Sequence, residues 1–215
     1  THEAASYNLE GYETHYTCQD NSAAGGVIIF TKSNLNSVEV YKHVTDVEAC
    51  VIEMRVGGRK IYVVGAYRSP SPKISNPVKF VEEALDSIFE ETDPPDDAFY
   101  LADANIDIKQ PRGLAEDDLN KMAEHGLEWV RTGPTRVIDL SNSMIDHIFK
   151  RESSAIHLKA VVCDSIRITD HQMIHLALEY DQPNEKVEFR PAKLKTDWKC
   201  FARALAKVEI AEYLD

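Results

Sequence analysis

The sequence is poor in the features that mark several protein classes. Its 215 residues contain no apolar run of about 18 residues, so no membrane-spanning helix is expected, and the N-terminus shows no signal-peptide pattern. The 4 cysteines form no Cys-x-x-Cys pair, which argues against a zinc site and favours free thiols in a reducing compartment. Lysine and arginine number 24 against 36 aspartates and glutamates, for a net charge of −12. Because non-specific binding to nucleic acid requires clustered basic side chains, any such surface must be local.

The pattern of apolar residues predicts one domain of mixed class. With 43% hydrophobic residues the chain can bury a sizeable core. Strands are predicted at residues 27–30, 48–56, 59–66, 98–101, 137–140, 144–149, 156–162 and 173–180. Gly57-Gly58 indicates a two-residue hairpin between the second and third of these. Residues 1–24 are expected to be irregular, and 27–30 to be a buried strand. The pattern supports an α/β or α+β fold.

Two helices are predicted between the strands, and a third after them. Asn76-Pro77 supplies an N-cap and a first helical position, and the apolar spacing continues until Pro94-Pro95. A second helix is predicted over 114–124, ending near Gly126. Residues 181–194 have the polar composition of a linker, and Thr196 caps an amphipathic helix after it. The domain is therefore expected to span 1–180, with a linker and helix over 181–215.

The chemistry of this sequence centres on the run from Leu101 to Asp107. An apolar strand leads directly into Asp103-Ala104-Asn105. Strand alternation would let the Asp103 and Asn105 side chains point the same way. A carboxylate can orient or deprotonate water, and an amide can hold that water or a phosphate oxygen without adding charge. Both residue types are also ordinary turn formers.

Three further segments accompany this pair. Tyr67-Arg68-Ser69-Pro70 follows an apolar strand, Ser143-Met144-Ile145-Asp146-His147-Ile148 carries a carboxylate in an apolar setting, and Thr169-Asp170-His171 precedes the last predicted strand. In this order the segments resemble the motif series of the endonuclease/exonuclease/phosphatase (DNase I-like) family. With Gly25-Gly26-Val27 and Pro134-Thr135-Arg136, the series is most similar to the endonuclease domains of non-LTR retrotransposons. The resemblance covers about residues 1–180.

The resemblance implies a fold and a set of roles. The fold is a four-layer sandwich of two mixed β-sheets flanked by helices. The implied activity is Mg²⁺- or Mn²⁺-dependent hydrolysis of DNA, leaving a nick that primes reverse transcription. The implied partners are DNA and a reverse transcriptase domain of the same polyprotein, and the implied location is intracellular, in the nucleus at the point of action. The resemblance implies catalytic roles for Asp103, Asn105, Asp146, His171 and Tyr67, a metal ligand at Asp170, and DNA contacts at Arg68, Thr135, Arg136 and Ser143.

Each role has a physical reason and an ordinary alternative. Asp146 would accept an imidazole N–H from His171 and fix its tautomer, so that His171 could stabilise charge on the scissile phosphate. Tyr67 could donate its hydroxyl to a phosphate oxygen, or be a packing aromatic. Asp170 could hold metal or only its own turn, and exposed arginines are usually solvated.

The sequence also departs from the family. The family's first strand carries an Asn and its second a metal-binding Glu, and neither has a counterpart in this sequence, so an incomplete domain is expected. Mg²⁺ usually takes one or two carboxylates among its oxygen ligands, which makes this Glu important. Two alternatives to the endonuclease therefore stay open: an inactive derivative that serves as an interaction module, and a phosphomonoesterase of the same fold.

Overall fold

The computed structural model describes residues 7–17, 25–44, 47–70, 85–86, 95–138, 141–151, 156–163 and 169–180. The chain forms two compact units, Thr1–Asp181 and Gln182–Asp215. The predicted linker and final helix lie outside the described residues, as does the predicted helix after Asn76-Pro77 apart from residues 85–86. In the part of the chain that is described, no helix is long and apolar enough to cross a membrane.

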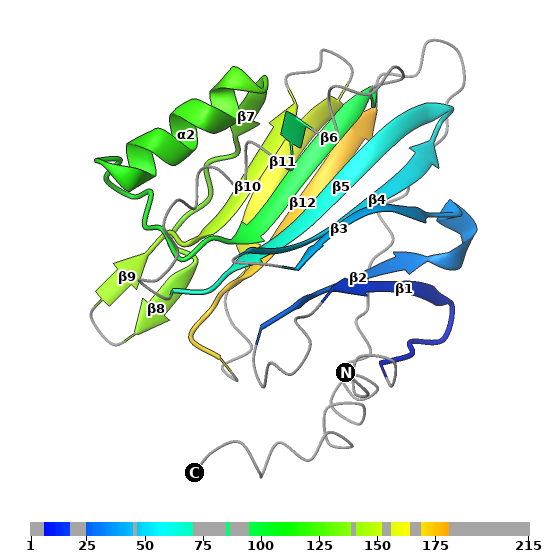
Figure 1. Cartoon of the computed structure of the whole chain (residues 1–215), viewed down its shortest axis with the longest axis horizontal. Coiled ribbons are helices and arrows are strands. Elements are labelled where there is room, and N and C mark those ends of the chain that lie inside the picture. The colour runs from blue at the N-terminus through cyan, green and yellow to red at the C-terminus, as the bar shows by residue number, and fades with distance from the viewer. Residues whose placement is uncertain are drawn as a thin grey trace. The chain divides into compact units, whose positions relative to one another are not determined.

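The framework of the first unit is a six-stranded sheet in the order β3-β4-β5-β6-β10-β7 (Figure 1). Its strands are β3 (Val38–Val44), β4 (Val47–Val56), β5 (Arg59–Arg68), β6 (Asp97–Asp103), β7 (Leu127–Trp129) and β10 (Asp146–Arg151). β5 and β6 run parallel, and the other four pairs are antiparallel. The predicted hairpin between β4 and β5 is confirmed, since Gly57 and Gly58 have φ of 58° and 80° and join Val56 to its partner Arg59.

One face of this sheet is covered by helix α2 (Leu114–Glu124). Alternate residues of the strands form the core on this side, and α2 contributes Ala115 and Met122 to it. The strand residues include Tyr62, Val64, Tyr100, Ala102 and Phe149. The helix occupies the predicted residues and is followed by Gly126 at φ 69°. The polar residues described below lie on the opposite face of the sheet from α2.

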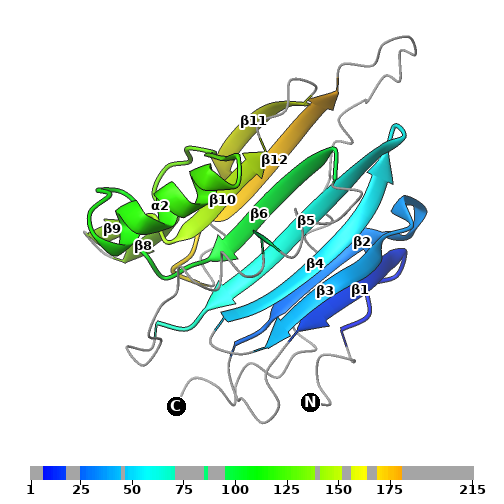
Figure 2. The ribbon, with the colours of Figure 1, turned by 45° about the horizontal axis from the view of Figure 1, so that its top comes forward.

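The opposite face carries two hairpins, β1 (Tyr12–Thr17) with β2 (Val27–Lys32) and β11 (Ile156–Cys163) with β12 (Met173–Tyr180). β2 lies close to β5, since a Cβ built on Gly65 would be 2.7 Å from Val27 Cγ1. Ile156 and Leu178 pack with Ile61 and Phe99 of the sheet. In Figure 2, β11 and β12 lie beside β10 and the β1–β2 hairpin lies at the other end, beside β3 and β4. The predicted sandwich is confirmed, although within the described residues only the six-stranded sheet is mixed.

Several local predictions were wrong. Residues 12–17 form β1, whose polar side chains were read as irregular, because pairing with β2 supplies the backbone hydrogen bonds that the apolar pattern does not reveal. β2 is a half-exposed strand, with Ile28 and Phe30 each 41% exposed. The edge strand β3 was not predicted, since Val38 and Val40 on it are exposed and give no buried pattern.

The region before β10 also differs from the prediction. Of the strand expected at 137–140, residues 137–138 belong to β8 (Arg136–Ile138), and 139–140 lie outside the described residues. β8 pairs with β9 (Ser141–Ser143), which was not predicted. Met144 and Ile145 are buried but precede the strand, which starts at Asp146. This hairpin lies at one end of the unit in Figure 1, next to the site.

Candidate active site

A row of polar residues crosses one edge of the six-stranded sheet. Tyr67 pairs with Asp103 across the parallel strands β5 and β6, and Asp103 pairs with Asp146 at the start of β10. On the far side of Tyr67, Glu48 of β4 is its register partner. Directly paired residues point to the same face, so these four side chains lie in sequence on the face that carries the hairpins. Register between parallel strands thus brings together residues that are 36 positions apart in the chain.

Asp103, Asp146 and His171 form the centre of this row. One ligand atom of each lies within 4.8 Å of those of the other two. His171 Nδ1 is 3.0 Å from both carboxylate oxygens of Asp146. A carboxylate only accepts hydrogen bonds, so Nδ1 carries the proton and Nε2 is the nitrogen left for other partners. The structure therefore brings together the pair that the sequence analysis matched.

The environment of Asp103 favours its neutral form. Burial is the main cause that raises the pKa of Asp103, and the negative charge of Asp146 raises it further, while His171 opposes both. The pKa of Tyr67 is raised by burial first, then by the charges of Asp103 and Glu48. Tyr67 thus stays a protonated phenol that can donate a hydrogen bond. The row carries an excess of negative charge that a cation would neutralise.

Asn105 is close to Asp103 for a different reason from the one predicted. β6 ends at Asp103, and Asn105 has a φ of 49°, so strand alternation does not relate the two. The Asn105 N–H donates to Asp103 Oδ1 at 3.3 Å, as in an Asx turn. Its side-chain Nδ2 donates to the carbonyl of Arg68 at 2.9 Å. The side-chain oxygen of Asn105 has the chemistry to accept a hydrogen bond from water.

Arg68 does not occupy the position predicted for a DNA contact. Its guanidinium donates to the carbonyl oxygens of Ala104 and, at 2.6 Å, of Asn105. It follows Tyr67 in β5 and so points to the opposite face of the sheet, the face of α2. The prediction failed because an arginine after a strand gives no indication of which carbonyls it will meet.

Thr135 is likewise a structural residue. Its side chain is 0% exposed, which excludes the predicted direct contact with DNA. Its hydroxyl accepts the N–H groups of Ile145 and Asp146 at 3.1 and 3.0 Å. Its backbone receives Gln172 N–H at 2.7 Å. Thr135 therefore connects the segment before Asp146 with the segment after His171.

The other predicted residues lie at the rim. Arg136 Nε is 2.6 Å from Asp170 Oδ2, and its side chain is 40% exposed. This arginine lowers the pKa of Asp170, which is not a member of the Asp103, Asp146 and His171 cluster. Ser143 is the register partner of Arg136 in the β8–β9 hairpin. The backbone of Arg136 also forms an isolated antiparallel β-bridge with that of His171. Asp170 therefore pairs with Arg136, and it does not join the carboxylates of Asp103 and Asp146.

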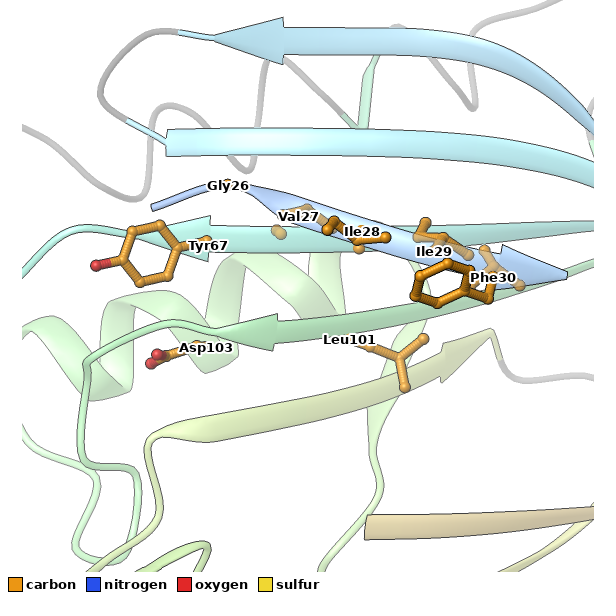
Figure 3. Close-up of a pocket in the computed structure, with 11 residues that line it drawn as sticks. Gly26, Val27, Ile28, Ile29, Phe30, Tyr67, Leu101 and Asp103 are labelled. Carbon is orange, nitrogen blue, oxygen red and sulfur yellow. The ribbon is translucent and has the colours of Figure 1, made fainter. Parts of the chain in front are cut away.

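A pocket of about 530 Å³ opens on the site from the side of β2. Figure 3 shows Val27 to Phe30 of β2 along one side, Leu101 below, and Tyr67 and Asp103 at one end. Val63 and Gly65 also line it. The pocket is apolar along β2 and becomes polar only at the Tyr67 and Asp103 end.

Sequence reasoning missed Glu48. It is 4% exposed, and its charge acts on Tyr67 across the strand pair. A glutamate at the start of a β-rich run is a weak signal. Only the register of β4 with β5 identifies it as a neighbour of the site.

No protein-family model matches this sequence, and no curated protein matches it. Solved structures match its fold. The mannosyl-6-phosphatase Bt3783 of Bacteroides thetaiotaomicron aligns with a TM-score of 0.57 at 18% identity, over 80% of this chain and 78% of that one.

Two other structures are similar to the same degree. An endonuclease/exonuclease/phosphatase family protein of Leptotrichia buccalis gives a TM-score of 0.60 at 14% identity, over 82% and 75% of the two chains. The endonuclease domain of TRAS1, a telomere-specific non-LTR retrotransposon, gives 0.59 at 15% identity, over 80% and 81%. The resemblance found in the sequence is confirmed at the level of the fold: this chain has the fold of the endonuclease/exonuclease/phosphatase proteins.

Proposed function

We propose that this domain hydrolyses phosphodiester bonds of DNA with a divalent cation, as a nicking endonuclease of the non-LTR retrotransposon type. The observation that carries the proposal is the cluster of Asp103, Asp146 and His171: Asp103 ends β6, which runs parallel to β5, and Asp146 lies opposite it at the start of the antiparallel strand β10. Such an edge, next to an open pocket, is a common place for ligands in sheets of this kind. The family resemblance of the motif series supports DNA as the substrate.

The donor set fits a divalent cation. Two carboxylates stand on adjacent strands, and the charge of one raises the pKa of the other, so a cation bound between them would relieve this repulsion. Mg²⁺ favours oxygen ligands, and Mn²⁺ also accepts an imidazole nitrogen. Asp103 and Asp146 would hold the ion, with Asp103 facing the pocket. When bound, the ion would polarise the phosphate and lower the pKa of a coordinated water.

The side chains of this chain would do the remaining work. His171, oriented by Asp146 and carrying a proton on both ring nitrogens, would donate its Nε2–H to a phosphate oxygen. Tyr67 would donate its phenol hydrogen, which its raised pKa retains. Asn105 would offer its amide oxygen to the attacking water, since its Nδ2 is occupied by Arg68.

The β8–β9 hairpin would contact the DNA. Arg136 and Ser143 lie on it next to His171, and Val137 and Ile138 expose 42% and 43% of their surfaces. Against a net charge of −12, this local contact must supply the affinity. A reverse transcriptase domain in the same polyprotein and action in the nucleus belong to this proposal.

The test is nicking of supercoiled plasmid with Mg²⁺ or Mn²⁺, and the controls are EDTA and a remote substitution. Asp103→Ala and His171→Ala should each reduce nicking by at least about 100-fold. Lys121→Ala should not, because Lys121 lies on α2, on the other face of the sheet, where it pairs with Glu124. Equal activity in all four proteins would overturn the assignment.

One other substrate class has a specific observation in its favour. The fold similarity to Bt3783, titled a mannosyl-6-phosphatase, is as high as that to the retrotransposon endonuclease domain. Turnover of p-nitrophenyl phosphate or mannose 6-phosphate with none on plasmid DNA would favour a phosphomonoesterase. Folded protein without turnover of either substrate would favour an interaction module.

A further inference from the structure

Behind the site, the loop that follows β6 is held by its carbonyl oxygens. We call residues 104–108 the 104–108 loop. Three consecutive carbonyls of this loop, those of Ala104, Asn105 and Ile106, each accept a hydrogen bond from a basic side chain. The Ala104 and Asn105 carbonyls both meet one guanidinium, whereas consecutive carbonyls of a strand point in opposite directions. The turn that gives Asn105 its φ of 49° accounts for this arrangement.

Arg68 supplies the first two contacts. Its Nε donates to the Ala104 carbonyl and its Nη2 donates to the Asn105 carbonyl. In return, the side-chain Nδ2 of Asn105 donates to the Arg68 carbonyl at 2.9 Å. The contact is reciprocal and joins the end of β5 to the residue beside Asp103. A planar guanidinium can meet two acceptors at once, which an ammonium group cannot do in the same geometry.

His147 supplies the third contact from the other side. It follows Asp146 in β10 and faces α2, with 1% exposure. Its Nε2 lies 2.7 Å from the Ile106 carbonyl, which can only accept, so Nε2 carries a proton. Its Nδ1 lies 3.1 Å from Asp118 Oδ2 of α2. The ring also packs edge-on against Phe149, with centroids 6.1 Å apart.

Asp118 connects the two basic residues. Its side chain is 3% exposed within the core face of α2. Its charge acts on Arg68, where it opposes the lowering of the pKa by burial, and it faces His147 directly. A carboxylate buried this deeply in an otherwise apolar layer is costly unless it balances charge. Its position places a negative charge beside His147, which is buried, and near Arg68, which is partly buried.

We propose that Arg68 and His147, balanced by Asp118, are positioning residues: they fix the 104–108 loop and thereby place Asp103 and Asn105 for catalysis. Arg68 acts on the chemical step and not on DNA binding. This inference rests on the proposed function, but the holding of the loop is a separate property of the fold.

The experiment compares Arg68→Lys with a matched control at the other end of the same strand. Arg59 pairs with Asp97 at 2.8 Å between the same strands β5 and β6, so Arg59→Lys makes the same chemical change away from the site. Arg68→Lys should lower kcat for metal-dependent nicking about 10- to 100-fold with KM and its salt dependence unchanged, since small displacements of reacting groups have effects of this size. Arg59→Lys should change neither constant.

A second pair of variants tests His147. His147→Phe keeps a ring in the packing but removes the donor, and it should behave like Arg68→Lys. His147→Gln keeps an N–H donor and should restore most of the lost kcat. Equal loss in both variants would mean that packing alone explains the residue, and would overturn its positioning role.

Amide hydrogen exchange separates this inference from the proposed function. The amides of Ala104 and Ile108 bond to the carbonyls of Ile145 and Met144. Arg68→Lys should speed their exchange at least about tenfold relative to core amides of β4, and Arg59→Lys should not. If no phosphoester is hydrolysed but this exchange difference appears, the loop contacts hold and the proposed function fails. Unchanged exchange, or a raised KM with a salt dependence reduced by about one phosphate contact, would overturn the inference.

Discussion

Replacing Thr135 by valine tests whether one buried hydroxyl holds the segment that leads into Asp146. Valine has nearly the shape of threonine, so the change removes only the oxygen that accepts the N–H groups of Ile145 and Asp146. A buried donor left without a partner costs about 1–3 kcal/mol. The Asp146 donor is only part-buried and should contribute the lower end, so the sum is about 3 kcal/mol. The backbone contacts of Thr135 with Ser143 and Gln172 remain unchanged.

The matched control is Thr135→Ser, which keeps the hydroxyl and removes one methyl group, at about 1 kcal/mol. For a domain of this size, about 3 kcal/mol corresponds to a fall in Tm of about 6–12 °C. Urea unfolding of the three proteins gives the free energies, and titration with Mn²⁺ reports whether the cluster still binds a cation. A valine variant as stable as the serine variant would refute the reasoning, because the hydroxyl would then contribute nothing to the free energy of unfolding.

Three other results are expected. Asp103→Asn should raise Tm at neutral pH. Burial and the charge of Asp146 raise the folded-state pKa of Asp103. The protonated carboxyl therefore stabilises the fold below the unfolded pKa of 3.8, and this stabilisation is lost as pH rises through the folded pKa. Thermal melts from pH 3 to 8 should show the variant's advantage vanish in acid, and an advantage that instead grows in acid would contradict the sign. Gly65→Ala should cost about 1–3 kcal/mol in urea unfolding, since its Cβ would meet Val27 Cγ1 at 2.7 Å, and Val27→Ala should recover part of this, which a purely backbone effect would not. Divalent cation should raise the Tm of the wild type but not of Asp103→Asn, and an equal rise in both would exclude Asp103 as a ligand.

The sequence predicted the parts of this fold that leave a local signal. The Gly57-Gly58 hairpin and the helix from Leu114 have turn and capping chemistry that operates within a few residues. β1 and β3 were missed because their side chains are mixed or exposed, and only pairing with a distant strand makes them strands. Propensity is a weak guide where tertiary pairing decides.

The candidate site divides in the same way. Asp146 and His171 could be matched from the motif series, and the structure brings them to 3.0 Å. Arg68 and Thr135 were assigned to DNA because their residue types suit phosphate contact, yet each points into the protein. Which face a side chain takes depends on strand register, and a change of one residue reverses it. Glu48 could not be found for this reason.

Register also explains why support and chemistry are adjacent in the sequence. Tyr67 and Arg68 are neighbours in β5, as Asp146 and His147 are in β10, and in each pair the first residue faces the site and the second faces α2. At the edge of the sheet the polar row therefore has a second row behind it, where Arg68, His147 and Asp118 hold the loop that carries Asn105. A substitution at the second member of either pair alters the site without touching anything bound there. Loss of activity at Arg68 or His147 is therefore evidence about the loop, and only the behaviour of KM and of salt dependence can make it evidence about DNA.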